Sequence, residues 1–231
     1  MASLNPFNRK KTLTIHGVLL SPNVRKVTAA LHHKGIEFEN EPVRPGTRTP
    51  EFLKISPLGY IPALEHGKFT VSDSAAIIEY LEDIYPKVSL LPRDPKDRAR
   101  ARFLSDFGGS KIFPQCADIM MNIAKPEFAN RPYNKEEFEG ALNVGLHDVL
   151  DILEGDTPSK GFYFDNKMTI ADIAIVAPIV SAYYGGYKVD PTRAPKMAAY
   201  VDRVMSHETF VKTLEPEKPL RELAFRPEFL E

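Results

Sequence analysis

The stretch GVLLSPNVRKVTAAL, residues 17–31, contains the change from strand to helix that decides the fold. An apolar run ends at Ser21, and a proline follows it. Apolar residues then recur at the three- and four-residue spacing of one helix face: Val24, Val27 and Leu31. Because serine before proline is typical of an N-cap followed by the first helical residue, the pattern puts the Ser21 hydroxyl at the strand-to-helix junction.

Short elements of alternating type extend from Leu13 to Tyr85. LTIHGVLL reads as a strand, the helix after Ser21 can end at Gly35, and a second extended segment begins at Ile36. IPALEHGKFTVSD gives two runs around a tight turn, and apolar spacing after Asp73 indicates another helix. The predicted order is strand, helix, strand, connector, hairpin and helix.

The rest of the chain shows a helical pattern. YPKVSLLPRDPKDR is rich in proline and charge, as linkers are, and no strand pattern persists beyond it. Helices are expected at roughly 95–124, 134–154, 169–184 and 194–206, followed by a proline-spaced tail. In KMTIADIAI, Thr169 and Asp172 have capping-box spacing, which anchors a core helix. We expect an α/β domain at 1–86, a linker at 87–94 and an all-helical domain at 95–231.

Composition limits the partners. The chain has 231 residues, with 30 Lys plus Arg against 31 Asp plus Glu, so neither sign of charge favours nucleic acid or an anionic membrane. The single cysteine, Cys116, is expected in the core, and it cannot form an internal disulfide. The adjacent His32 and His33 lack metal-ligand spacing and are expected at the surface, so no metal is predicted.

Cellular location follows from the apolar segments. The N-terminal MASLNPFNRKK is polar and basic and starts no secretory h-region, so export is not expected. The most apolar stretch, IADIAIVAPIVSAYYGG, is shorter than the roughly 20 residues of a membrane span. We therefore expect a buried core helix there and a cytoplasmic protein without a membrane segment.

Three features of the first half each allow a structural and a functional interpretation. Ser21 can cap a helix, or it can add a donor to an anion site at the helix N-terminus. Pro62 in LGYIPAL can start a strand, or a cis bond after Ile61 can expose backbone groups to a ligand's main chain. Asp73 and Ser74 can cap a helix, or they can hold an amino group and a carboxylate together.

Taken together, four segments resemble the cytosolic glutathione S-transferases: SPNVRKV, PEFLKISPLGYIPAL, VSDSAAIIEYLEDIYP and KMTIADIAI. The resemblance runs from about Leu13 to Val211 and is closest to the serine-type phi class and its bacterial and fungal relatives. It implies a thioredoxin-like N-terminal domain that binds glutathione, followed by an all-helical domain that contributes the electrophile site. The pattern analysis gives the same division.

The resemblance also implies residue roles. Ser21 matches the serine that hydrogen-bonds the glutathione sulfur. Ile61 precedes the cis-proline, Pro62, and its backbone would pair with the cysteinyl unit. Other positions match the sites for the two ends of the tripeptide: Asp73 and Ser74 for the γ-glutamyl end, and Arg48 near the glycine carboxylate.

The chain departs from the family pattern at two positions. Tyr60 replaces a glutamine that would touch the tripeptide, and Asp73 is one methylene shorter than the usual glutamate. Either change would weaken glutathione binding. Whether Asn23 shares the sulfur contact with Ser21 stays open.

The implied activity is conjugation of glutathione, the co-substrate, to an apolar electrophile. Candidates for the electrophile pocket are Leu19, Leu20, Phe107 and Phe113, with Met120 or Met121, although each can equally be a core residue. A homodimer is expected, and the aromatic residues that can serve its interface are Phe103, Phe107, Tyr183 and Tyr184.

Two other functions remain open on the sequence. Hydroperoxide reduction needs only an activated glutathione sulfur, whereas disulfide chemistry would need a cysteine where the chain has Ser21. The same fold also serves as a non-catalytic interaction or ligand-carrying domain. Retention of Ser21, Pro62, Asp73 and Ser74 favours the enzyme.

Overall fold

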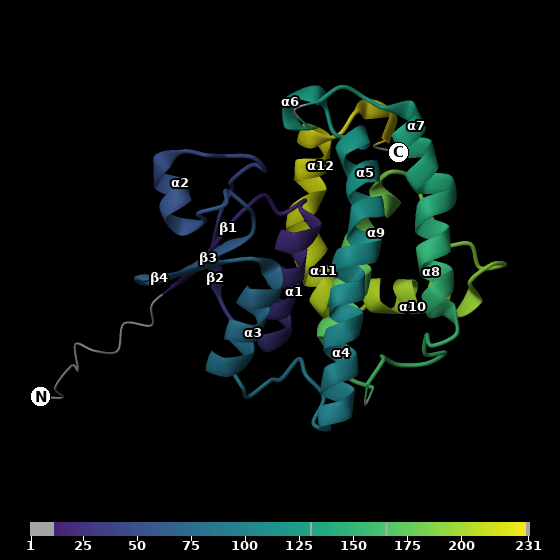
Figure 1. Cartoon of the computed structure of the whole chain (residues 1–231), viewed down its shortest axis with the longest axis horizontal. Helices are drawn as coiled ribbons and strands as arrows, with labels where there is room; N and C mark the ends of the chain where they lie inside the picture. The colour runs from purple at the N-terminus through teal and green to yellow at the C-terminus, as the bar shows by residue number, and fades with distance from the viewer. Residues whose placement is uncertain (1–11, 130, 165, 230–231) are drawn as a thin grey trace, which may run out of the picture.

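A computed structural model of the protein describes residues 12–129, 131–164 and 166–229. It has a sheet-containing half and a helical half (Figure 1). Segment 1–11, on which the prediction against export rests, lies outside the described residues. The sheet-containing half consists of β1 (Leu13–His16), α1 (Pro22–Lys34), β2 (Phe38–Glu41), α2 (Pro50–Ile55), β3 (Ala63–His66), β4 (Phe69–Ser72) and α3 (Ser74–Ile84). The predicted order of elements is therefore confirmed.

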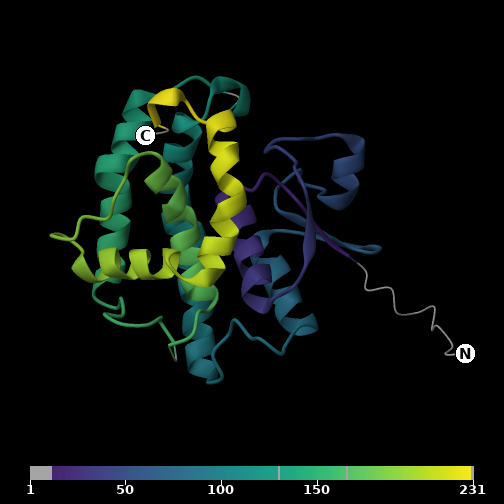
Figure 2. The same ribbon diagram turned by 180° about the vertical axis from the view of Figure 1, so that it is seen from behind.

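The four strands form one mixed sheet in the order β2-β1-β3-β4. β1 and β2 are parallel, so a crossover must join them, and α1 is that crossover. Gly35 ends α1 with φ 65°, as the sequence predicts, and β3 and β4 form the predicted hairpin. α1 and α3 cover one face of the sheet and α2 the other, which is the thioredoxin-like arrangement (Figures 1 and 2).

Among the described residues of the second half, the elements of regular structure are all helical. Its elements are α4 (Pro95–Phe107), a π-helical segment η1 (Gly108–Ile112), α5 (Phe113–Ile123), α6 (Pro126–Ala129), α7 (Lys135–Gly140), a second π-helical segment η2 (Ala141–Gly145), α8 (Leu146–Glu154), α9 (Ile170–Tyr184), α10 (Pro195–Met205), α11 (Glu208–Leu214), the 3₁₀ turn η3 (Glu215–Glu217), α12 (Lys218–Ala224) and the 3₁₀ turn η4 (Pro227–Phe229). The first two predicted helices each contain a π-helical segment, and α9 and α10 match the other two.

The prediction of a proline-spaced tail after residue 206 is wrong, because α11 and α12 lie there. Prolines open η3 and α12, where a missing backbone N–H leaves no helical hydrogen bond unmade. α11 runs beside α1 (Figure 2). His32 and His33 are therefore half-buried between these helices, and their Nδ1 atoms lie 2.9 and 3.2 Å from the hydroxyls of Thr213 and Thr209. Their prediction as surface residues is corrected accordingly.

α9 is the central helix of the second half, and it packs against α1, α4 and α5. Its residues from Ile170 to Ala182 are all buried, as expected for a core helix. The Asp172 carboxylate accepts hydrogen bonds from the backbone N–H and the hydroxyl of Thr169, at 2.7 and 2.8 Å, which fixes the first turn. Cys116 lies in the same core, as predicted. Among the described residues, no helix is long and apolar enough to cross a bilayer.

A fully buried arginine joins the two halves. Arg25 of α1 pairs with Glu217 of η3, with nitrogen-to-oxygen distances of 2.6 and 2.7 Å. Its guanidinium also donates to the Ala177 carbonyl and the Ser181 hydroxyl of α9, and to the Leu20 carbonyl. A buried charge is tolerated only when it is paired and hydrogen-bonded throughout, and these contacts meet that condition.

We predict that Glu217→Ala strongly destabilises the fold, because it leaves the Arg25 charge buried without its partner. The loss should be about 3–5 kcal/mol in the free energy of unfolding, measured by urea denaturation. Glu215→Ala is the matched control, since Glu215 lies in the same 3₁₀ turn but its side chain is 66% exposed against 1% for Glu217. That control should cost at most about 1 kcal/mol. Equal losses in the two variants would contradict the prediction.

Candidate active site

The loop before α1 is held by a close approach of backbone to side chains. Gly17 has φ 151°, and a Cβ on it would lie 2.6 Å from Val24 Cγ2 and 3.2 Å from Ile61 Cβ. Only glycine fits between these atoms without a shift of the backbone. Gly17 therefore brings the loop that carries Ser21 against both the start of α1 and the residue before Pro62.

Ser21 is the N-cap residue of α1, as predicted, and Pro22 follows as the first helical residue. Its backbone is extended, with φ −67° and ψ 127°. Within the described part of the chain, the Ser21 side chain makes no capping hydrogen bond to the helix. The hydroxyl is thus available to a ligand at the positive end of α1.

The peptide bond between Ile61 and Pro62 is cis. The Pro62 carbonyl accepts a hydrogen bond from the Asp73 N–H at 3.3 Å, so the turn and the start of α3 are fixed together. Asp73 has φ 88°, an unfavourable value for a residue with a Cβ. Its Oδ1 atom accepts from the N–H groups of Ala75 and Ala76 at 2.8 and 3.0 Å, which caps α3 and compensates for the strain.

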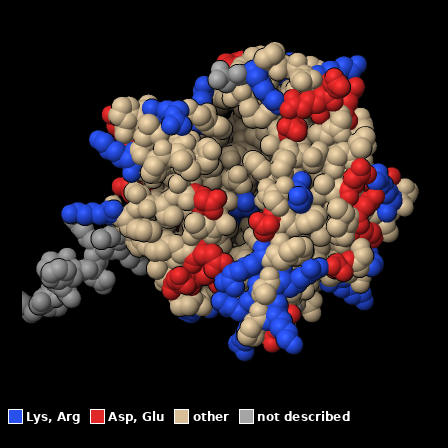
Figure 3. Space-filling view, viewed as in Figure 1, with Lys and Arg blue, Asp and Glu red and all other residues tan. Residues whose placement is uncertain are grey.

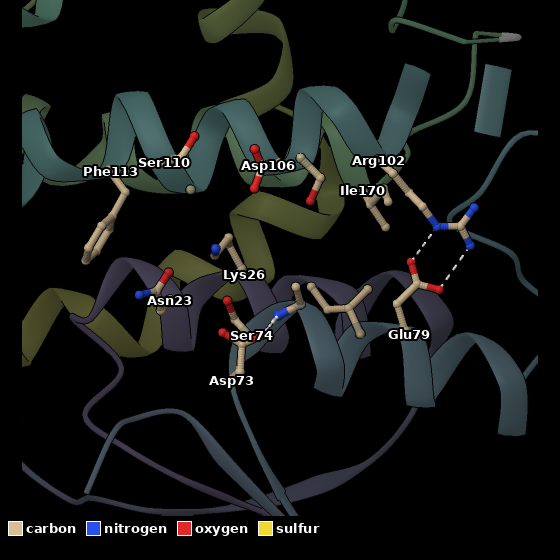
Figure 4. A pocket seen from close by; sticks show the side chains of 14 residues that line it. Asn23, Lys26, Asp73, Ser74, Glu79, Arg102, Asp106, Ser110, Phe113 and Ile170 are labelled. Carbon is tan, nitrogen blue, oxygen red and sulfur yellow. Dashed lines mark hydrogen bonds and ion pairs between the residues drawn. The ribbon is translucent and has the colours of Figure 1, made fainter. Parts of the chain in front are cut away.

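A cavity of about 490 Å³ lies between the sheet-containing half and the helical half. Figure 3 shows the groove between the two halves, with acidic and basic side chains facing one another along it. Figure 4 shows the cavity walls, with α1 and the start of α3 on one side and α4 to α5 on the other. The lining includes Asn23 and Lys26 of α1, Asp73, Ser74 and Glu79 of α3 and its cap, Arg102, Asp106, Gly109, Ser110 and Phe113 from the opposite wall, and Ile170 of α9.

The predicted glutathione residues fall into three groups. Asp73 and Ser74 line the cavity. Ser21, Ile61 and Pro62 are not among the described residues that line it. Ser21 lies two residues before Asn23, which does line it, and the Pro62 carbonyl accepts a hydrogen bond from the N–H of Asp73.

Arg48 and Tyr60 form the third group, in the exposed loop region between β2 and β3. The Arg48 guanidinium donates to the Leu58 carbonyl at 3.1 Å, and Tyr60 is 65% exposed. Neither Arg48 nor Tyr60 is among the described residues that line the cavity.

Of the four residues predicted for an electrophile pocket, Phe113 lines the cavity. Leu20 is buried in the core, and Leu19 and Phe107 pack against it. Helix geometry explains why Phe107 does not line the cavity. The face that does so carries residues at three- and four-residue spacing: Arg102, Asp106, Gly109 and Phe113. Phe107 lies off that face, and its ring packs 6.3 Å from the ring of Phe103. Met120 and Met121 are half-buried and lie further along α5.

Sequence analysis missed Lys26. Its side chain is 8% exposed and points into the space between the walls (Figure 4). Burial lowers the pKa of Lys26 from 10.5 to about 8, although the nearby Asp73 carboxylate partly opposes that shift. The sequence offers one signal, since Asn23 and Lys26 share a helix face at three-residue spacing, but which wall that face meets depends on the packing of α3 and α4.

Comparisons with known proteins agree with this geometry. Residues 15–92 match the family model described as glutathione S-transferase, N-terminal domain, and residues 116–208 match glutathione S-transferase, C-terminal domain. A thioredoxin-like half with a cis-proline, a helical half and a cleft between them define a two-domain protein of the thioredoxin-like class. The chain belongs to the cytosolic glutathione S-transferase family.

Two curated relatives and one solved structure illustrate the similarity. A zeta-class glutathione S-transferase of Euphorbia esula is 31% identical over 84% of this chain and 86% of its own length. A maleylacetoacetate isomerase of Pseudomonas aeruginosa is 30% identical over 80% of this chain and 87% of its own. The crystal structure of glutathione transferase F2 from Populus trichocarpa superimposes with a TM-score of 0.76, at 21% identity over 90% of this chain and 99% of that one.

We predict that burial of Lys26 makes stability depend on pH. The unfolded chain keeps the proton on this amine up to about pH 10.5 and the folded protein only to about pH 8. Because the unfolded state binds more protons between these values, the free energy of unfolding should rise with pH across this window. Lys26→Met should remove that rise, whereas Lys111→Met, which changes an exposed lysine of η1, should retain it. Urea denaturation across the window tests this, and parallel curves for wild type and Lys26→Met would refute it.

Proposed function

We propose that the protein is a glutathione transferase that activates the glutathione thiol through the Ser21 hydroxyl and conjugates it to electrophiles. The observation that carries the proposal is the position of Ser21 at the N-terminus of α1, with a side chain that does not cap its helix, in the loop whose Gly17 approaches Ile61 of the cis-proline turn. Glutathione would bind in the half formed by residues 1–86, and residues 95–231 would provide the opposite wall. Its Cys-Gly backbone would pair with Ile61 and extend toward Tyr60 and Arg48.

The interactions available at Ser21 are strong enough to lower the pKa of the glutathione thiol by the required amount. A free thiol has a pKa near ~8.5, so little thiolate exists at neutral pH. Lowering that pKa by about two units needs roughly 2.7 kcal/mol of preferential stabilisation of the anion. One hydrogen bond to a charged group contributes about 1.5–3 kcal/mol and a helix N-terminus about 0.3–1 kcal/mol. Ser21 and the end of α1 together would therefore account for such a shift without a general base.

The electrophile would enter between Phe113 and the glutathione sulfur, with its apolar part on Phe113 and Ile170. Leu19, Leu20 and Phe107 would support this region from the core rather than contact the substrate. The single cysteine and the need for reduced glutathione both favour work in the cytoplasm.

A second candidate is isomerisation of an unsaturated acid, which the name of the Pseudomonas aeruginosa relative suggests. A thiolate that adds to a conjugated double bond turns it into a single bond, which can rotate before the thiolate leaves.

Hydroperoxide reduction would use the same thiolate, and a non-catalytic carrier would bind glutathione without lowering the pKa of its thiol. Product analysis with an unsaturated diacid, a hydroperoxide and a chloronitrobenzene would separate the three reactions.

We predict that Ser21→Ala raises the pKa of the bound glutathione thiol. The variant should lose about 10- to 100-fold in kcat/KM below neutral pH, with a smaller loss at alkaline pH, where the thiol ionises unaided. Thiolate absorbance of bound glutathione, titrated from acid to alkaline pH, gives the pKa directly. Ser110→Ala removes another hydroxyl of the same cavity and should leave the titration unchanged.

The same titration of Asn23→Ala settles whether the amide shares the sulfur contact. A shift in Asn23→Ala as large as that in Ser21→Ala would replace the single-donor assignment with a shared one. An unchanged thiol pKa in Ser21→Ala would reject the role of Ser21.

We also propose that the protein is a homodimer, and that Phe103 of α4 lies in the interface. Phe103 is 50% exposed although it is large and apolar. Tyr184 is a poorer candidate than the sequence indicates, since its hydroxyl donates to the buried Glu217 at 3.0 Å. Sedimentation should give twice the chain mass of 26.0 kDa. Phe103→Glu should give the monomer, and Ile152→Glu, at the 68% exposed Ile152 of α8, should not. A dimer that survives Phe103→Glu would reject this interface.

A further inference from the structure

Lys26 is a buried cation that the proposed activation of the thiol does not use. Among the described residues, no side chain or carbonyl forms a hydrogen bond or an ion pair with its ammonium group, although the side chain is 8% exposed. A Cβ placed on Gly109 would lie 3.8 Å from Nζ, so the amine reaches from α1 to the opposite wall. Figure 4 shows it between Asn23, Ser74 and Asp106. The amine therefore stands in the cavity without a partner of its own.

The other charges of the cavity are carried by α3 and its cap, and by α4. Glu79 and Arg102 pair with each other at 2.9 and 3.1 Å, so their charges cancel. Asp73 and Asp106 remain, one on each wall, while α1 adds the neutral Asn23 and the segment after α4 adds Ser110 and Phe113. One ammonium thus faces two carboxylates across a gap. The complement of this set is a head group that itself carries one ammonium and one carboxylate.

We propose that Lys26 binds the α-carboxylate of the γ-glutamyl unit of glutathione and so selects for an intact amino-acid head group. This proposal rests on the proposed function, since it assumes that glutathione is the ligand. The α-amino group would lie against Asp73 and Asp106. The α-carboxylate would bridge Lys26 and the hydroxyl of Ser74, which is 5% exposed and begins α3.

Binding should then be coupled to protonation of Lys26. Without ligand, burial opposes the ammonium form and lowers the pKa of Lys26 to about 8. A ligand carboxylate favours the ammonium form, so it should raise that pKa and draw a proton from the buffer above about pH 8. Affinity should therefore be highest below about pH 8 and fall as the pH rises beyond it. The glutathione thiol releases a proton on activation, so the probe must lack a free thiol.

The first experiment uses S-methylglutathione and the intact protein. Calorimetry at about pH 8.5, in two buffers of different ionisation enthalpy, should show proton uptake on binding to wild type. Lys26→Met should bind about 10- to 100-fold more weakly and take up less proton than wild type, because only the α-amino group of the ligand then titrates in this range. Lys26→Arg keeps a charge that does not titrate in this range, so its affinity should depend less on pH than that of wild type. Lys111→Met should behave as wild type.

The second experiment removes the ligand group instead. The S-methyl tripeptide in which 4-aminobutyrate replaces γ-glutamate lacks the α-carboxylate, and the one in which glutarate replaces it lacks the α-amino group. Lys26→Met should weaken binding of the glutaryl analogue as much as that of S-methylglutathione. It should not change binding of the aminobutyryl analogue, because the contact is already missing. Equal losses for all three ligands would overturn the proposal.

The outcomes also separate this proposal from the proposed function. Unchanged S-methylglutathione binding in Lys26→Met, with the Ser21→Ala effect intact, would reject the role of Lys26 alone. A raised KM for the electrophile with unchanged glutathione affinity would reject it too and would assign the amine to the electrophile. Failure of wild type to bind S-methylglutathione at millimolar concentration would reject both.

Discussion

The structure depends on the buried ion pair between Arg25 and Glu217. A guanidinium with no solvent contact must have every donor satisfied within the protein, and the partners of Arg25 come from the loop before α1, from α9 and from η3. These segments are far apart in the sequence, so the pair forms only when both halves have folded and docked. Docking in turn fixes the rotation of α1. The Arg25 charge therefore allows one rotation of α1 against α9, whereas apolar packing alone would allow several.

That register determines what α1 presents to the cleft. Arg25 and Lys26 are adjacent, so their side chains leave the helix about 100° apart. When Arg25 points to α9, Lys26 must point toward α3 and α4. The loop that carries Ser21 approaches Ile61, the residue before Pro62, at Gly17. One cation is fully paired within the protein and stabilises the assembly. The other is buried and has no equivalent partner among the described residues. Burying an unpaired charge is unfavourable, and a ligand carboxylate would supply the missing partner.

Local signals in the sequence were enough to predict the order of strands and helices in the first half. Ser21 before proline, Gly35, the turn at Gly67 and the carboxylate of Asp73 each act within a few residues, and each has the predicted role in the structure. The tail after residue 206 could not be predicted in this way, because prolines that read as helix breakers lie in first turns, where they are tolerated. Lys26 and Arg25 were missed for a different reason. Their roles are set by the helices that pack against α1, and a single sequence does not contain that information.

The site of Asp73 shows how a local departure can be compensated across the cleft. With φ 88° and Oδ1 accepting two hydrogen bonds from the first turn of α3, the short aspartate side chain stays close to the helix end. A glutamate is one methylene longer and would carry its charge further into the cavity. The head group of a ligand held by aspartate would consequently lie nearer α3, where Ser74 and the Lys26 amine line the same cavity and Asp106 faces them. In the proposed complex, the shorter acid and the buried lysine would then be parts of one arrangement, in which the lysine would hold the carboxylate of a head group drawn toward the helix.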